Sequence, residues 1–246
     1  MSEMSNRRII QTDLLVGLKD VSVSYVSDKV ALNKVNLKIF SGEKIAVVGK
    51  NGSGKTTLGK LLAALVEPSD GEVVINQPAC YLFQNPENQV VMPTVEREVA
   101  FGFENMAMDP KIMHEKVEGL LRAFGLFKKK SSNVEELSGG QLQRLAIASL
   151  VGLEYRLFFF DEPYAYLDPD SVRNVDDILN DLVDDGVTVM VVIHRPQYLE
   201  KFNYQRVLLF DRGRLEYDGP VGNFMRSRKL LAMAGWNGDF YFKFKK

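Results

Sequence analysis

The sequence predicts an α/β fold with a mixed or parallel β-sheet, an antiparallel β subdomain at the N-terminus and an inserted helical subdomain. Short apolar runs alternate with segments of helical periodicity, which is typical of α/β architecture. Two nearly continuous apolar runs, 157–160 and 187–193, are expected to be strands buried on both faces of a parallel sheet. Helical segments dominate between 84 and 152, where no strand pattern is convincing. Three helices are expected there: 94–106, 110–124 and 138–151.

The first third of the chain is expected to form strands joined by short connections, with one helix among them. Residues 18–25 and 35–40 alternate apolar and polar side chains, as half-exposed strands do. Residues 44–48 run apolar into a glycine-rich loop, 54–66 has helical character up to a proline, and 71–76 is another strand candidate. Because the connections are too short for crossover helices, part of the strand pairing should be antiparallel.

The composition excludes several classes of protein. The chain has 246 residues, with 31 Lys and Arg against 32 Asp and Glu, so its formal net charge is −1. It is 46% hydrophobic, which argues against a disordered chain, and the balanced charge argues against a polycation that holds nucleic acid. The single cysteine, Cys80, rules out an intramolecular disulfide or a multi-cysteine zinc site, and we expect a small buried hydrophobe.

Hydropathy gives no indication of a membrane-spanning segment. No apolar stretch reaches the roughly 18–20 residues that a spanning helix needs, and residues 1–13 lack the apolar core of a secretory signal. We therefore expect a soluble, cytoplasmic protein. This expectation is compatible with docking onto a membrane partner.

Residues 49–56 match the pattern G-x-x-x-x-G-K-[ST] and are called the phosphate loop below. Glycines let backbone N–H groups turn toward phosphate oxygens, and the start of the following helix adds positive potential. Lys55 is expected to reach the β- and γ-phosphates, and the Thr56 hydroxyl to ligate Mg²⁺. A plain glycine-rich turn is the alternative, but the apolar run before the loop and the helix after it are the context that the motif requires. The predicted nucleotide-binding residues of this loop are Gly49, Lys50, Asn51, Gly52, Ser53, Gly54, Lys55 and Thr56.

The apolar run 157–160 ends in two acids, Asp161 and Glu162. A strand that ends beside the phosphate loop places Asp161 where it can hold Mg²⁺ directly or through water. Glu162, one residue later, can polarise a water for in-line attack on the γ-phosphate. Two acids after a strand more often cap a helix when they occur alone. Together with the phosphate loop they favour a catalytic role.

Residues 137–141 read Leu-Ser-Gly-Gly-Gln and are called the signature below. Ser138 and Gln141 have the spacing of a capping box, so a well-capped core helix is one interpretation. However, Gly139 and Gly140 weaken the first turn of a helix, which makes sense if the backbone must approach a ligand. With the phosphate loop and the Asp-Glu strand, this sequence resembles the signature of ATP-binding cassette (ABC) ATPases.

This resemblance extends over about 14–219 and implies the ABC ATPase fold, built on a phosphate-loop nucleoside triphosphatase core. In this family each ATP lies between the phosphate loop of one chain and the signature of another. The whole chain, 1–246, would then be one domain. Its expected parts are a nucleotide-binding core at about 14–83 and 153–219, a helical subdomain with the signature at about 84–152, and a C-terminal extension at about 220–246.

The resemblance also implies roles for residues outside these motifs. Tyr25 matches the aromatic residue that stacks on adenine, although an ordinary strand tyrosine is the alternative. Thr57 joins the ATP-binding set, and Gln84 matches the glutamine that senses Mg²⁺ and the γ-phosphate and signals to a membrane subunit. Asp168 lies in the loop that crosses to the partner ATPase. His194 matches the switch histidine at the γ-phosphate, at the strand end where phosphate chemistry gathers in such sheets.

Two segments depart from the family pattern. Residues 164–166, Tyr-Ala-Tyr, replace the small residues that are commoner before the Leu-Asp pair of the crossing loop. Arg195 and Pro196 follow His194, where an acid is frequent. These departures bear on the geometry of the loops and leave the phosphate chemistry unchanged.

A narrower resemblance lies in 83–89, FQNPENQ, and in 94–102, TVEREVAFG. Both look like the ATPase subunits of energy-coupling-factor transporters, importers of vitamins and transition-metal ions. The resemblance implies a second ATPase, in a heterodimer rather than the equally complete homodimer, a transmembrane coupling protein and a membrane substrate-binding component. It places the chain peripherally on the cytoplasmic face of the membrane. Glu87 is expected to pair with a basic side chain of the coupling protein, and an exposed loop carboxylate is the plainer alternative.

Two other classes of function remain as alternatives. A non-transport ABC ATPase of DNA repair or translation typically carries a long coiled coil or two cassettes, and neither pattern is present in the sequence. A phosphate-loop kinase or GTPase would not need the signature, the Asp-Glu pair and the terminal histidine together. The tail 240–246 alternates aromatic and basic residues, which is compatible with a partner contact or with a tail packed on its own domain.

Overall fold

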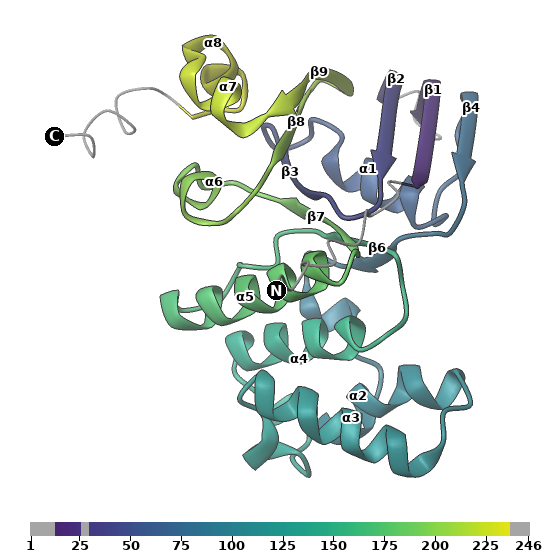
Figure 1. Ribbon diagram of the computed structural model, residues 1–246, viewed down its shortest axis with the longest axis vertical. Helices are drawn as coiled ribbons and strands as arrows, with labels where there is room; N and C mark the ends of the chain where they lie inside the picture. The colour runs from purple at the N-terminus through teal and green to yellow at the C-terminus, as the bar shows by residue number, and fades with distance from the viewer. Residues whose placement is uncertain (1–12, 26–29, 237–246) are drawn as a thin grey trace, which may run out of the picture.

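The computed structural model describes residues 13–25 and 30–236, in two β-sheets and the helices around them. Figure 1 shows the smaller sheet and α1 at one end of the long axis and helices α2, α3 and α4 at the other. The tail 240–246, for which two alternatives were open, lies outside the described residues. None of the helices in the described ranges is long and apolar enough to cross a membrane.

The smaller sheet is antiparallel, as predicted, with the strand order β2-β1-β4. Its strands are β1 (Leu14–Ser24), β2 (Val30–Phe40) and β4 (Asp70–Ile75). β1 and β2 begin earlier than the alternating patterns predict, because their backbones stay paired from Leu14 with Phe40 to Ser24 with Val30. Several shifts of register interrupt this ladder, so side-chain alternation alone does not mark its length.

The larger sheet is mixed and has the strand order β5-β6-β7-β3-β8-β9. The pairs from β5 to β8 are parallel, and β9 returns antiparallel to β8. β8 and β9 were not predicted from the sequence, although β8 carries an apolar run buried on both faces. In order along the sheet the strands are β5 (Cys80–Leu82), β6 (Leu157–Phe160), β7 (Thr188–Val192), β3 (Lys44–Val48), β8 (Arg206–Asp211) and β9 (Arg214–Pro220).

The central strands separate two hydrophobic cores, which explains why their sequences are apolar at nearly every position. Ile45 and Val47 of β3 belong to the core shared with α1 and the smaller sheet. Ala46 and Val48, which point the other way, belong to the core shared with α4 and α5. Burial on both faces is the property predicted for parallel strands, and it is confirmed here. Cys80 is buried as expected, and burial raises the pKa of its thiol to about 12.

The three helices predicted in the insertion are confirmed within one residue at each end: α2 (Val95–Asn105), α3 (Pro110–Ala123) and α4 (Gly139–Val151). Figure 1 shows them together at one end of the molecule, with α5 (Pro169–Asp184) beside α4. Helix α5 was not predicted from the sequence, and neither were the short helices α6 (Gln197–Lys201), α7 (Val221–Arg226) and α8 (Arg228–Met233).

A helix was predicted over 54–66, but helix α1 spans Lys55–Leu62. The predicted end was therefore wrong by four residues. Ala64 adopts a left-handed conformation with φ of 56°. The N–H of Leu65 donates to the carbonyl of Lys60, and that of Ala64 to the carbonyl of Leu61. These two bonds form a Schellman motif, which normally places glycine where alanine stands here. A helix end without its usual glycine leaves no sequence signal before Pro68.

A buried polar network joins the start of β3 to α5. Lys44 and Asp176 are 1% and 2% exposed, and their Nζ and Oδ1 atoms lie 2.7 Å apart. Lys44 Nζ also donates to Asn180 Oδ1 at 2.7 Å, and the Tyr164 hydroxyl donates to Asp176 Oδ1 at 2.6 Å. Burial lowers the pKa of Lys44, and the Asp176 carboxylate opposes that shift. The two charges therefore depend on each other for solvation.

We predict that Asp176→Ala lowers the free energy of unfolding by about 3–5 kcal/mol, because it leaves the Lys44 ammonium buried without its counter-charge. Urea unfolding followed by circular dichroism measures the effect. Asp177→Ala is the matched control: it removes the same side chain from the adjacent, exposed position of α5 and should change stability by about 0.5 kcal/mol or less. Equal losses in the two variants would contradict the network's role.

Candidate active site

The phosphate loop leaves β3 and enters α1 with three glycines at positive φ: Gly49 at 144°, Gly52 at 74° and Gly54 at 111°. A Cβ at Gly49 would lie 2.2 Å from the carbonyl oxygen of Phe210, and one at Gly54 would lie 2.7 Å from that of Ala31. Both contacts exclude any side chain, in addition to the unfavourable φ. The loop is therefore held against β8 and β2 by its own backbone.

The start of α1 offers donors to an anion. The N-cap, Gly54, has no side chain, so no cap competes for the N–H groups of the first turn. Lys55 Nζ donates to the carbonyls of Gly49 at 2.8 Å and Lys50 at 3.0 Å, so the ammonium lies over the loop. Burial lowers the pKa of Lys55, and Asp161 and Glu162 oppose that shift. The buried Ser53 hydroxyl has no hydrogen-bond partner among the described residues, and a phosphate oxygen would supply one. This donor set fits a polyphosphate.

Asp161, at the end of β6, is 1% exposed and receives two hydroxyl groups on one oxygen. Thr56 Oγ1 and Tyr81 Oη each donate to Asp161 Oδ2 at 2.8 Å. Burial raises the pKa of Asp161, and the two hydroxyl donors oppose that shift. Sequence reasoning missed Tyr81, because only the pairing of β5 with β6 brings it to this carboxylate.

The oxygen atoms available for Mg²⁺ belong to Thr56, Asp161 and the Gln84 amide. In the described ranges no three His, Cys, Asp or Glu residues cluster in a way that could hold a metal without other ligands. Mg²⁺ that binds with a nucleotide takes one or two protein oxygens and completes its shell with phosphates and water. The residues present therefore fit a nucleotide-bound magnesium ion rather than a protein-only site.

Glu162 follows in a left-handed conformation, with φ of 58°, which is uncommon for a residue with a side chain. Its Oε1 accepts a hydrogen bond from Gln84 Nε2 at 2.8 Å and lies 2.9 Å from His194 Nε2. The His194 contact is close in distance but not aligned as a hydrogen bond. His194 lowers the pKa of Glu162, and partial burial opposes that shift. The left-handed turn thus aims the carboxylate at two of the predicted residues.

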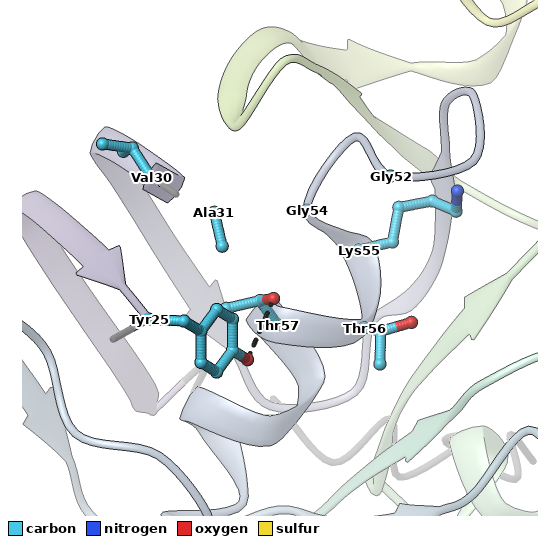
Figure 2. Close-up of a pocket in the computed structure, with 8 residues that line it drawn as sticks. All are labelled: Tyr25, Val30, Ala31, Gly52, Gly54, Lys55, Thr56 and Thr57. Atoms are coloured by element: carbon cyan, nitrogen blue, oxygen red, sulfur yellow. Dashed lines mark hydrogen bonds between the residues drawn. The ribbon is translucent and has the colours of Figure 1, made fainter. Parts of the chain in front are cut away.

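A pocket lies beside the phosphate loop, between the smaller sheet and the start of α1. Figure 2 shows Tyr25 and Thr57 on one side of this helix start and Lys55 and Thr56 on the other. The Tyr25 hydroxyl and Thr57 Oγ1 are 3.3 Å apart, and the tyrosine is 42% exposed. An exposed ring beside the phosphate loop is available for stacking on a base. The pocket is lined by Tyr25, Val30, Ala31, Gly52, Gly54, Lys55, Thr56 and Thr57.

The signature forms the start of α4 with the predicted capping box. Ser138 Oγ accepts from the N–H of Gln141, and Gln141 Oε1 accepts from the N–H of Ser138. Gly140 is required by the chain itself, because a Cβ there would lie 2.9 Å from the carbonyl oxygen of Tyr166. At Gly139 the nearest atom to such a Cβ would be 4.0 Å away, the Tyr166 Cβ. Contacts within the chain therefore require a glycine at position 140 but not at position 139.

Asp168 caps α5, accepting from the N–H groups of Asp170 and Ser171 and from the Ser171 hydroxyl. These bonds, those to Ser171 above all, lower the pKa of its carboxyl. No hydrogen bond in the described part of the chain joins Asp168 or the signature to the phosphate loop. By hydrogen bonding, the described residues group instead into a cluster formed by Lys55, Thr56, Gln84, Asp161, Glu162 and His194, of which the signature and Asp168 are not part. Lys50 and Asn51 stand exposed at the tip of the loop.

The two departures from the family pattern have structural counterparts. Tyr164 is buried and bonds to Asp176 and to the Tyr204 hydroxyl, at 2.6 and 2.9 Å. Tyr166 has φ of 62° and is 69% exposed. Pro196 leads directly into α6. Sequence reasoning treated Tyr164 as a departure and missed that it joins the Glu162 segment to the buried Lys44 network.

A phosphate loop at the end of a central parallel strand, in a sheet where the second strand along, β6, ends in two acids, defines a phosphate-loop nucleoside triphosphatase. Comparison with known proteins identifies the family within this class. The sequence pattern of the family described as "ABC transporter" matches residues 32–165. The chain belongs to this family of ATPases, which couple ATP hydrolysis to transport.

The chain is similar to ATP-binding proteins of energy-coupling factor transporters. It is 37% identical over 220 residues to EcfA1 of Thermotoga maritima, covering 85% of this chain and 83% of that protein. It is 32% identical over 235 residues to EcfA of Methanothermobacter thermautotrophicus, covering 89% and 75%.

Solved structures resemble the fold. The cbiO1 protein of Clostridium perfringens, part of the ABC transporter complex cbiONQ, has a TM-score of 0.74 at 25% identity, covering 93% of this chain and 97% of its own. A dimeric ATP-binding cassette in a post-hydrolysis state, bound to ADP and Pi, has a TM-score of 0.76 at 26% identity, with 84% and 98% covered.

The two glycines of the signature give a matched test of the packing against Tyr166. We predict that Gly140→Ala lowers the free energy of unfolding by about 1–3 kcal/mol, because its Cβ must displace the Tyr166 carbonyl. Gly139→Ala should leave stability unchanged or raise it by up to about 1 kcal/mol, because its Cβ would make only an ordinary contact with Tyr166 Cβ at 4.0 Å. Thermal unfolding of both variants measures the difference, and Gly140→Ala as stable as Gly139→Ala would refute the contact.

Proposed function

We propose that this chain is the ATP-hydrolysing subunit of an energy-coupling-factor importer of vitamins or transition-metal ions. The observation that carries the proposal is the cluster of Lys55, Thr56, Gln84, Asp161, Glu162 and His194 around the phosphate loop. The resemblance of 83–89 and 94–102, and the relatives named above, support the energy-coupling-factor assignment within the ABC family. The substrate itself would be selected by a membrane component.

In this proposal the triphosphate of ATP lies along the phosphate loop, with its base toward Tyr25. Backbone N–H groups of the loop and the Lys55 ammonium hold the β- and γ-phosphates. Thr56, Asp161 and Gln84 would hold Mg²⁺, which neutralises charge that develops on the phosphates. The proposed nucleotide contacts also include Gly49, Lys50, Asn51, Gly52, Ser53, Gly54 and Thr57.

Glu162 acts as the general base in this proposal. Its Oε1 is held by the Gln84 amide and faces His194, so the carboxylate has a defined position at the edge of the phosphate site. His194 keeps the pKa of Glu162 below its ordinary range, so the carboxylate is ionised at neutral pH and able to accept a proton from water. The water attacks the γ-phosphorus, the bond to the β-phosphate oxygen breaks, and ADP and phosphate result. Lys55 and His194 stabilise the transferring group.

Ser138, Gly139, Gly140, Gln141 and Asp168 would act on the ATP bound by a second chain. We propose a heterodimer with a related ATPase, a homodimer being chemically complete as well. The core at about 14–83 and 153–219 would hold the nucleotide, the helical part at about 84–152 would move as the dimer closes, and about 220–246 would form a C-terminal extension. The assembly would include a transmembrane coupling protein and a membrane substrate-binding component, with no nucleic acid, at the cytoplasmic face of the membrane.

We predict that Glu162→Gln lowers kcat for ATP hydrolysis by at least about 100-fold, because the amide cannot accept the proton from water. ATP binding should persist, since the isosteric side chain keeps an oxygen for the Gln84 amide. Phosphate release and equilibrium binding of ATP are the two measurements. Glu154→Gln is the control, because Glu154 is exposed and precedes the opposite end of the same strand, β6. Unchanged hydrolysis in Glu162→Gln would remove Glu162 from this role.

Docking on a basic partner segment is tested at Glu87, which is exposed on the turn before α2. In detergent extracts, tagged wild-type chain should retain a second ATPase and a multi-span membrane protein, identified by mass spectrometry. Glu87→Lys should reduce the membrane protein recovered several-fold, because like charges at an interface are strongly unfavourable. Glu115→Lys, the same exchange at an exposed position of α3, should not. A wild-type chain recovered only as a free monomer would contradict the transporter assignment.

A further inference from the structure

Trp236, the only tryptophan in the chain, reaches the segment that carries His194. Its indole Nε1–H donates to the backbone carbonyl of His194 at 2.9 Å. The two residues are 42 positions apart, and the bond joins the end of the described C-terminal segment to the residue that faces Glu162. The indole therefore contacts the backbone of a predicted catalytic residue through this hydrogen bond.

The position of the indole is determined from several sides. The backbone N–H of Trp236 donates to the carbonyl of Leu231 at 2.8 Å, and Gly235 before it has φ of 86°, so a tight turn closes α8. The ring meets Phe224 of α7 edge-on, with centroids 5.8 Å apart and planes at 88°. It also packs against the core shared by α4 and α5. An N–H group on a ring held this firmly imposes a geometry on its acceptor.

The same turn lies against the phosphate loop. A Cβ at Gly235 would lie 3.3 Å from Lys50 Cγ, so this glycine leaves room for the Lys50 side chain. The turn after α8 thus touches the two segments that flank the catalytic cluster: the phosphate loop through Gly235 and the His194 segment through Trp236. Neither residue belongs to a motif identified in the sequence.

We propose that Trp236 is a positioning residue for His194. The indole bond fixes the plane of the peptide that follows His194, and with it the direction in which the imidazole leaves the backbone. Without the N–H donor, the His194 segment loses this anchor between the end of β7 and the start of α6. The imidazole then spends less time beside Glu162 Oε1 and the transferring phosphoryl group. The proposal rests on the function proposed above, because it acts through the catalytic use of His194.

The test compares two variants that each lose one side-chain donor to a backbone carbonyl in the same C-terminal cluster. Trp236→Phe keeps an aromatic ring beside Phe224 but removes the indole N–H. Tyr217→Phe removes the hydroxyl that donates to the Pro220 carbonyl at 2.8 Å, on a ring that also contacts Phe224. We expect kcat for ATP to fall about five- to tenfold in Trp236→Phe, as for one lost hydrogen bond, with KM within about twofold. In Tyr217→Phe both constants should stay at wild-type values.

A double-mutant cycle separates positioning from a general loss of stability. In the His194→Ala background, adding Trp236→Phe should lower kcat no further, because the imidazole that the indole positions is already absent. Hydrogen–deuterium exchange of the full chain gives a readout independent of activity. Peptides covering 193–199 should exchange faster in Trp236→Phe than in wild type, and at the wild-type rate in Tyr217→Phe.

These measurements distinguish failure of the proposed function from failure of the role proposed for Trp236. A wild-type complex with no ATPase activity would overturn the proposed function, whatever the exchange data show. An active wild type overturns the role of Trp236 if Trp236→Phe keeps full kcat, lowers kcat equally in the His194→Ala background, or leaves exchange over 193–199 unchanged. The kinetics are measured on the chain assembled with its partners, so that turnover reflects the protein in its working state.

Discussion

The parallel pairing of β6, β7 and β3 is the constraint on which the site depends. Phe160 pairs with Val191, and Val47 pairs with Val192, so the three strands end at one edge of the sheet. The phosphate loop, the Asp-Glu pair and His194 each follow one of these ends. Residues more than a hundred positions apart therefore meet without any loop having to reach far, as expected at the carboxyl ends of parallel strands.

Burial on both faces makes this edge of the sheet rigid enough for chemistry. It also leaves a charged side chain at the opposite end of β3 without water. Lys44, at the start of β3, is buried and needs Asp176, which in turn accepts from Tyr164. Tyr164 stands two residues after Glu162, whose left-handed backbone is strained. The same network that solvates Lys44 thus anchors the segment in which this strain is held. A polar cluster of this kind adds little net stability and instead specifies one arrangement of β3, α5 and the catalytic segment.

The parts of the site that local spacing determines could be predicted from the sequence, and the parts that depend on tertiary neighbours could not. The phosphate loop, the two acids after β6 and the capping box of α4 each lie within a few consecutive residues. Tyr81 and Trp236 act on partners 80 and 42 positions away, so their contacts depend on strand order and on the docking of α8. The early end of α1 was missed for a different reason: Ala64 takes a conformation that sequence rules reserve for glycine.

The separation of the signature from the phosphate loop bears on how many chains an ATP site needs. The start of α4 packs on the Tyr166 carbonyl, and its capping box satisfies its own first turn, so nothing in the described contacts draws it toward the phosphate loop of the same chain. In the dimer proposed above, the signature would act on nucleotide bound by the second chain. Tyr166 is exposed between the Glu162 segment and the capped start of α5, and in the dimer proposed above its side chain would be free to contact the second chain. A bulky side chain at positive φ costs of order 1–3 kcal/mol, which a contact with that chain would offset.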